Sequence, residues 1–312
     1  MKTSPSISIV IPTYKRPGML AELTQALSAQ LTACPSQVLV VDNCPDGSAR
    51  AFVAAQDGFE YLHEARGGVV NARNTGVAAA TGEYILFLDD DEVPAPGWLD
   101  AFAAQAQAGV DMAFGRILPR YDGVPDPALE PLLHKLFSRD YDLAPGADIA
   151  AHYAELGTGN ALFHKARCLG GTPPFDMRFN TRGGEDIYLI KSLMDQGMGL
   201  AWCPGGQVEE LVPATRMTAN YLKDRRYNQG QQRCLFLAGN PSLTKKAQVL
   251  PWMGVGAVQA LAAAARRSWA RARGDEAAVL HDIQVQGGLG KLFWWSEPSR
   301  HLYGTAPEET PS

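Results

Sequence analysis

The sequence predicts an α/β protein with a mostly parallel central sheet flanked by helices and a helical extension at the C-terminal end. Two observations support this fold class. Short β-rich runs alternate with helical patterns through the first third of the chain, which is typical of strand–helix–strand units with parallel strands buried on both faces. After Pro241 the composition changes, and 247–265 is rich in alanine and uncharged, so we expect a domain over 1–240 and a helical extension over 241–312.

The elements follow from local patterns, taken in chain order. Leucines recur at helical spacing from Leu20 to Leu31, behind Pro17, which suits the first turn of a helix. The stretch from Leu118 to Ala150 carries five prolines and is expected to be an irregular connection over the active face. A helix is expected to begin near Glu185, and a longer one to run from about 215 to 238. Strands are expected at Ile7 to Ile11, Val38 to Asp42, Phe59 to His63, Tyr84 to Leu88, Val110 to Gly115 and Gly159 to Phe163.

The stretch 247–265 is long enough to span a bilayer, and it contains no charged residue. Pro251, Gln259, two glycines and seven alanines make it only weakly hydrophobic, so a transmembrane helix is the less favoured interpretation. A helix that packs against the protein or lies at a membrane interface is favoured, and peripheral membrane association stays open.

Charge and cysteine content exclude some classes of function. The net charge is -5 and the pI is about 5.7, so the chain lacks the basic footprint of a protein that grips nucleic acid. The cysteines number five and form no Cys-x-x-Cys pair, which favours reduced thiols over a disulfide framework or a zinc site. Ile7 to Ile11 is only of strand length and precedes Pro12 and Lys15, unlike a secretory signal, so we expect a cytoplasmic protein.

The acidic run "FLDDDE" at 87–92 directly follows an apolar strand. One interpretation is a solvated acidic turn, because aspartate is favoured in turns and at helix caps. The other interpretation is a binding site for a hard divalent cation, because Mg²⁺ is often held by one or two carboxylates together with substrate phosphates. The spacing does not match a calcium loop, and the sequence contains no P-loop motif, so any phosphate would be handled by metal and side chains.

Four ordered motifs resemble those of the family 2 inverting glycosyltransferases, which have the GT-A fold. They are "SIVIPTYKRP" at 8–17, "VLVVDNCPDGS" at 38–48, "GGVVNARNTGVAAATGEYILFLDDDEVP" at 67–94 and "GGEDIYL" at 183–189. "FLDDDEVP" together with "VEELVPATR" at 208–216 is similar to the bacterial exopolysaccharide branch, the succinoglycan-type glucosyltransferases. The resemblance covers about three quarters of the chain.

The resemblance implies a nucleotide-sugar site and a divalent metal, Mn²⁺ or Mg²⁺. Asp89 would face the ribose, Asp91 would ligate the metal, and Asp42 would accept a hydrogen bond from the base. For Arg73 a pairing with the diphosphate and an ordinary position on a helix surface both stay open. The residues expected to contact the nucleotide sugar are Pro12, Thr13, Tyr14, Arg16, Asp42, Asn71, Arg73, Asn74, Asp89 and Asp90.

The same resemblance assigns the general base to Asp186, although an acid in the first turn of a helix can also be explained by the helix dipole. Many relatives place a histidine ligand where this chain has Val208-Glu209-Glu210, so Glu210 is expected either to replace it as a metal ligand or to be an ordinary exposed glutamate. Trp98, Gly184 and Glu185 are expected near the acceptor.

The function expected from these residues is transfer of a hexose, with glucose favoured, from a UDP-sugar to a growing oligosaccharide carried on polyprenyl diphosphate, at the inner face of the cytoplasmic membrane. The alternative is a catalytically silent nucleotide-binding or scaffold subunit of a polysaccharide assembly. A sugar nucleotidylyltransferase is disfavoured, because Pro12-Thr13-Tyr14 stands where its glycine-rich phosphate loop would follow the first strand.

Overall fold

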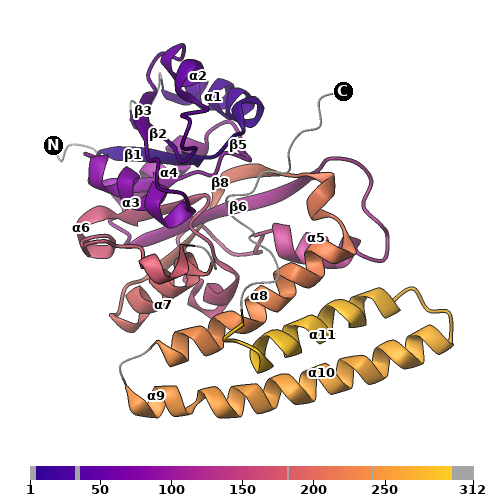
Figure 1. Cartoon of the computed structure of the whole chain (residues 1–312). Coiled ribbons are helices and arrows are strands. Elements are labelled where there is room, and N and C mark those ends of the chain that lie inside the picture. The colour runs from indigo at the N-terminus through magenta and orange to yellow at the C-terminus, as the bar shows by residue number, and fades with distance from the viewer. Residues whose placement is uncertain (1–4, 32–35, 181–182, 240–241, 297–312) are drawn as a thin grey trace. The chain divides into compact units, whose positions relative to one another are not determined.

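The computed structural model describes residues 5–31, 36–180, 183–239 and 242–296 (Figure 1). The described residues divide into two compact units, one formed by 5–120 and 137–211 and the other by 121–136 and 212–296. Cys34 and Pro241 lie outside the described residues. The other cysteines, Cys44, Cys168, Cys203 and Cys234, are free and buried.

The first unit is built on an eight-stranded sheet of order β3-β2-β1-β4-β7-β6-β8-β5. Four neighbouring strands are parallel, namely β1 (Ile7–Thr13), β2 (Gln37–Asp42), β3 (Glu60–His63) and β4 (Tyr84–Phe87). Beyond β4 the pairing changes: β7 (Ala161–His164) is antiparallel to both β4 and β6 (Met112–Tyr121), and β5 (Glu92–Pro94) is antiparallel to β8 (Leu200–Val212). The sheet is therefore mixed, and its parallel part is the N-terminal half.

Helices cover both faces of this sheet because successive strand residues point to opposite sides. Ile9 and Ile11 of β1 face a core that includes leucines of α1 (Pro17–Leu31) and Trp98, Leu99 and Phe102 of α4 (Trp98–Gln107). Val10 faces the other core, shared with α3 (Val69–Ala79) and α7 (Glu185–Asp195). A Cβ at Gly76 of α3 would lie 2.3 Å from Val10 Cγ1, so only glycine permits this close helix–sheet approach.

The expected irregular connection at 118–150 is wrong in two places. Strand β6 continues to Tyr121, and a helix, α5, occupies Glu130–Phe137. Leu129, Leu133 and Phe137 are buried at helical spacing, and Pro131 falls in the first turn, where its missing N–H costs nothing. The remaining short elements are α2 (Arg50–Ala54), α6 (Lys165–Cys168) and the 3₁₀ helices η1 (Ala150–Glu155), η2 (Met177–Phe179) and η3 (Ala214–Arg216).

The second unit contains α8 (Ala219–Ala238), α9 (Leu243–Ala247), α10 (Val249–Ala272) and α11 (Ala278–Leu292). Glycines of α11 let the helix backbones approach closely, since a Cβ at Gly288 would lie 2.6 Å from Ala260 N of α10. Asp282 of α11 pairs with Lys223 of α8 at 2.6 Å and with Arg267 of α10 at 2.8 Å. Figure 1 shows these three helices side by side.

Candidate active site

The neighbouring ends of β1 and β4 bring the first motif to the aspartate triplet. Thr13 Oγ1 donates to Asp90 Oδ2 at 2.9 Å, and Arg16 Nη1 donates to Asp90 Oδ1 at 2.8 Å and to Asp91 Oδ2 at 3.2 Å. These contacts arise because adjacent parallel strands present their carboxyl ends at the same edge of a sheet, the usual place for ligands. The aspartate triplet is thus held from β1, by one hydroxyl and one guanidinium.

Arg73 joins the triplet to the acids that open α7. Its Nη1 donates to Glu185 Oε1 at 2.5 Å and its Nη2 to Asp89 Oδ1 at 3.4 Å. Gly184, with φ of 92° in the left-handed region, turns the chain into α7, so that Glu185 and Asp186 occupy the first helical turn. Arg73 is buried, so the structure does not place it as an ordinary surface arginine of α3.

Asp186 lies within electrostatic range of Asp89, so the two acidic motifs face the same region. The Asp186 charge acts on Asp89, as does the charge of Asp91. Asp186 Oδ1 accepts the Ile187 backbone N–H at 2.8 Å, and a Cβ at Gly157 would lie 3.1 Å from Asp186 Oδ2. The absence of a side chain at Gly157 therefore leaves room next to this carboxylate.

A loop held by Arg139 forms the other side of the site, and no sequence motif pointed to it. The buried Arg139 guanidinium donates from Nη2 to the carbonyls of Gly159 and Asn160, at 2.9 and 2.8 Å, and from Nε to Gly115 O at 2.7 Å. A Cβ at Gly159 would lie 2.7 Å from Asp89 Oδ2 and 2.9 Å from Glu92 Oε1. Arg139 therefore fixes a glycine loop directly against the triplet.

Glu92 and Glu210 extend the acidic cluster onto β5 and β8, where they face each other in the antiparallel register. Glu92 Oε2 accepts the Asp89 backbone N–H at 2.9 Å. Both glutamates act electrostatically on Arg139, and Glu210 also acts on Glu92. Glu210 thus lies at the edge of the same cluster.

The cluster carries more negative charge than its arginines neutralise. Burial raises the pKa of Glu185 to about 7, and the neighbouring Asp186 adds to the rise while Arg73 opposes it. Burial likewise raises the pKa of Asp90 to about 6 against the effect of Arg16, and holds the pKa of Glu92 well above its ordinary range. Asp89 is the most open of the three aspartates, with 36% of its side chain exposed against 7% for Asp90 and 9% for Asp91. A bound cation would relieve this repulsion.

The donor set fits a divalent cation shared with a ligand. Within the described ranges, no group of three or more His, Cys, Asp and Glu side chains is placed to hold a metal by itself. Mg²⁺ and Mn²⁺ prefer oxygen ligands, and Mg²⁺ in particular is commonly held by one or two carboxylates plus substrate phosphates. Asp91, with Glu210 nearby in the cluster, fits that incomplete type of site.

Several residues expected to contact substrate also make hydrogen bonds within the protein. Asp42 is fully buried, and its carboxylate accepts the backbone N–H groups of Cys44 at 2.9 Å and Ala49 at 2.7 Å. Trp98 is also fully buried and donates from Nε1 to Asn160 Oδ1 at 2.8 Å.

The amides of the "NARN" segment are engaged in a similar way. Asn74 exchanges two 3.0 Å hydrogen bonds with the Phe175 backbone, and Asn71 Nδ2 donates to Gly67 O at 3.0 Å. Pro12 and Tyr14 are half-buried, Pro12 within the last residues of β1 and Tyr14 just after its end.

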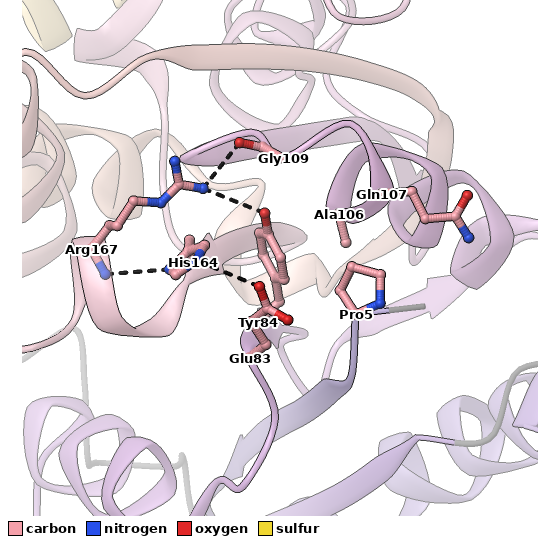
Figure 2. Close-up of a pocket in the computed structure, with 8 residues that line it drawn as sticks. All are labelled: Pro5, Glu83, Tyr84, Ala106, Gln107, Gly109, His164 and Arg167. Carbon is pink, nitrogen blue, oxygen red and sulfur yellow. Dashed lines mark hydrogen bonds and ion pairs between the residues drawn. The ribbon is translucent and has the colours of Figure 1, made fainter. Parts of the chain in front are cut away.

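A hollow of about 460 Å³ lies elsewhere, at the opposite end of β4 (Figure 2). Figure 2 shows Arg167 reaching across it toward Tyr84 and Gly109. Its guanidinium also pairs with Asp111 at 2.6 Å and donates to Val110 O at 2.9 Å, so its donors are used inside the protein. This hollow contains none of the expected site residues.

Comparisons with known proteins find sequence relatives of this chain. The family model described as glycosyl transferase family 2 matches residues 8–154. The succinoglycan biosynthesis protein ExoM of Rhizobium meliloti is 30% identical over 91% of this chain and 93% of its own length. The pre-mycofactocin glycosyltransferase of Mycobacterium tuberculosis is 29% identical over 64% of this chain and 41% of its own length.

Solved structures share the fold. The structure of S. aureus TarS 1-349 in complex with UDP-GlcNAc has a TM-score of 0.53 at 16% identity, covering 78% of this chain and 69% of that one. TarS 1-349 in complex with UDP has a TM-score of 0.51 over 90% of this chain and 89% of that one. The predicted fold class is therefore confirmed.

Proposed function

The chain belongs to the family 2 glycosyltransferases, and on that premise we propose that it transfers a hexose, with inversion, from a UDP-sugar to a growing oligosaccharide. Glucose is the sugar we propose, and polyprenyl diphosphate the carrier of the acceptor, in cell-surface polysaccharide synthesis at the inner face of the cytoplasmic membrane. The likeness to a succinoglycan biosynthesis protein along almost the whole of both chains supports this substrate class.

Asp186 is the general base of the proposal. The acceptor hydroxyl gives its proton to the Asp186 carboxylate while the acceptor oxygen bonds to the anomeric carbon of the donor. The bond from that carbon to the diphosphate oxygen breaks on the opposite face, and its electron pair leaves with the UDP. The missing side chain at Gly157, where a Cβ would lie 3.1 Å from Asp186 Oδ2, supports an approach of the acceptor there.

Glu185 and Arg73 position this base. The buried pair between them anchors the first turn of α7, and Arg73 reaches Asp89 from the same guanidinium. The orientation of Asp186 is therefore tied to the place where the donor is expected, which is the condition for a productive attack geometry. The observation that carries the proposal is that one guanidinium, that of Arg73, bonds both to Asp89 of the triplet and to Glu185, the neighbour of Asp186.

The donor is proposed to lie at the ends of β1 and β4, with Asp89 toward the ribose and Asp91 and Glu210 holding Mn²⁺ or Mg²⁺. Such an ion stabilises the charge that develops on a leaving diphosphate. Thr13 and Arg16 keep Asp90 and Asp91 in place for this role.

Two substitutions test these roles in a screen of UDP-sugars for Mn²⁺-dependent donor hydrolysis and transfer. Asp186→Asn should bind UDP as the wild type does and lose transfer by about 10²–10⁴-fold, the usual contribution of a general base. Asp91→Asn should lose Mn²⁺-dependent binding of UDP, measured by calorimetry.

Asp100→Asn is the matched control, because Asp100 is an exposed acid in the first turn of α4 and has the same favourable position relative to a helix dipole. It should leave transfer unchanged. Wild-type turnover in Asp186→Asn, or a loss in Asp100→Asn as large as that in Asp186→Asn, would contradict the assignment of the base.

A further inference from the structure

The outer face of α10, defined by Leu250, Val258, Leu261 and Trp269, is an exposed apolar row. These four side chains are between 63% and 72% exposed, and their spacing places them on one side of the helix. The exposed helix surface between them carries Gly254, Ala265 and one polar side chain, Ser268, and it has no charged residue from 247 to 265. Single exposed apolar residues are ordinary on a protein surface, but a continuous row along a helix marks an interaction site.

The opposite face of α10 is used within the second unit. Gly256, Ala260 and Ala263 are buried, and Gly256 and Ala260 pack closely on Gly288 of α11. Arg267 fixes the same face to Asp282. The helix therefore packs within the unit through one side only. Figure 1 shows α11 lying between α10 and α8.

Positive charge predominates around this face, although Asp282 of α11 pairs with Arg267 and Arg271. Residues 225–274 contain nine of the chain's 28 Lys and Arg residues and none of its 33 Asp and Glu residues, although the whole chain has a net charge of -5. Lys245 and Lys246 precede α10, and Arg266, Arg271 and Arg273 stand at its other end. The Arg273 guanidinium lies over the Trp269 ring at 4.5 Å, so a cation accompanies the aromatic residue at that end.

From this combination we infer that the outer face of α10 docks on the surface of a bilayer that contains anionic phospholipids, with the helix lying in the plane of the interface. An apolar row with cations at its ends is the surface that such an interface binds, since acyl chains cover the row and headgroups pair with the cations. The inference stands on the surface of α10 and does not depend on the reaction proposed above.

Two other uses of this helix agree less well with the structure. By length and composition the stretch Leu243–Ala272 qualifies as a membrane span, with a mean hydropathy of 1.3 in its best window and 22% of that window buried. Spanning would require α10 to leave α11, breaking the pair of Arg267 with Asp282 and the packing on Gly288. A symmetric pairing with a second copy would bring the cationic ends of two α10 helices together, and these ends would repel each other.

The test is sedimentation of the full chain with vesicles of phosphatidylglycerol and phosphatidylcholine, or of phosphatidylcholine alone. The wild type should bind the anionic vesicles and not the neutral ones, and raising the salt concentration should weaken binding because it screens the cations. Leu250→Ser, Val258→Ser and Leu261→Ser combined should lower the partition coefficient by at least about tenfold, since each removes apolar area from the contact. Val124→Ser, at a 94% exposed valine in the same unit, is the control and should bind as the wild type.

Circular dichroism and donor hydrolysis without vesicles keep the outcomes separate. The triple variant should keep the wild-type spectrum and the wild-type hydrolysis rate, because the three side chains are exposed and lie outside the first unit. Equal binding of wild type and triple variant, absence of wild-type binding, or a wild-type dimer that the triple variant dissociates would each overturn the inference. A failure of sugar transfer would leave the vesicle result unaffected.

Discussion

Replacing Arg73 with methionine should destabilise the protein in a way that depends on pH. The side chains of Arg73 and Glu185 are 6% and 2% exposed, and their charged atoms lie 2.5 Å apart. Removing one partner of a buried ion pair leaves the other charge buried without compensation, which lowers the free energy of unfolding by about 3–5 kcal/mol. A loss of this order is expected for Arg73→Met at pH 8, where Glu185 of the wild type is charged and is stabilised most by Arg73.

The expected loss becomes smaller at low pH, because Glu185 can take up a proton. Its pKa is already raised to about 7 with Arg73 present, and losing the guanidinium would raise the pKa further. At pH 5.5 the variant would therefore bury a neutral carboxyl, and its stability deficit should fall to about 1–3 kcal/mol, the range for a buried polar group left unpaired.

Urea unfolding at pH 8 and pH 5.5, with linear extrapolation to water, measures these differences. Arg73→Met combined with Glu185→Gln should recover much of the loss at pH 8. Arg120→Met is the matched control, because Arg120 also pairs with a glutamate at 2.5 Å but at 38% exposure, and exposed pairs contribute under about 1 kcal/mol. A deficit below about 1 kcal/mol for Arg73→Met at pH 8, or equal deficits at both pH values, would refute the reasoning.

Three further predictions concern the same site. Glu185 has a folded-state pKa of about 7 against an ordinary 4.5, so its contribution to stability is greatest below pH 4.5 and is lost as the pH rises through 7; Glu185→Gln should flatten this slope in urea melts. Gly159→Ala should lower the free energy of unfolding by about 1–3 kcal/mol through overpacking against Asp89 and reduce kcat, whereas Gly18→Ala, with no atom within 4 Å, should do neither. Arg139→Lys should lower the free energy of unfolding by about 2–4 kcal/mol, since lysine cannot replace the planar fork of donors; an unchanged melt would contradict its proposed role.

The first half of the fold could be predicted from periodicity because its elements are local and regular. The runs at β1 to β4 and the leucines of α1 follow the expected spacing closely. The antiparallel direction of the strands beyond β4 could not be predicted, because the alternation of side chains is the same in parallel and antiparallel strands. Helix α5 was missed because the five prolines of 118–150 suggested a loop, although Leu129, Leu133 and Phe137 have helical spacing.

The motifs pointed to the right region, but the partners of individual side chains depend on residues far away in the sequence. The Arg73 side chain meets Glu185, 112 residues later, and no local pattern reports such a contact. Arg139 has no motif around it. Its role is visible only in the folded structure, where its guanidinium donates to the carbonyls of Gly159 and Asn160. The turn at Asp42 could have been predicted from the sequence, because aspartate commonly accepts the backbone N–H two residues later in a turn.

A crystal structure of the protein with UDP and Mn²⁺ tests the central claim most directly, which is that the acids after β4 and those opening α7 serve one site. The claim predicts an anomalous Mn²⁺ peak at Asp91, with the diphosphate beside Asp89 and Asp186 facing the sugar side. Nucleotide bound in the hollow around Arg167, or Mn²⁺ away from the aspartate triplet, would contradict it.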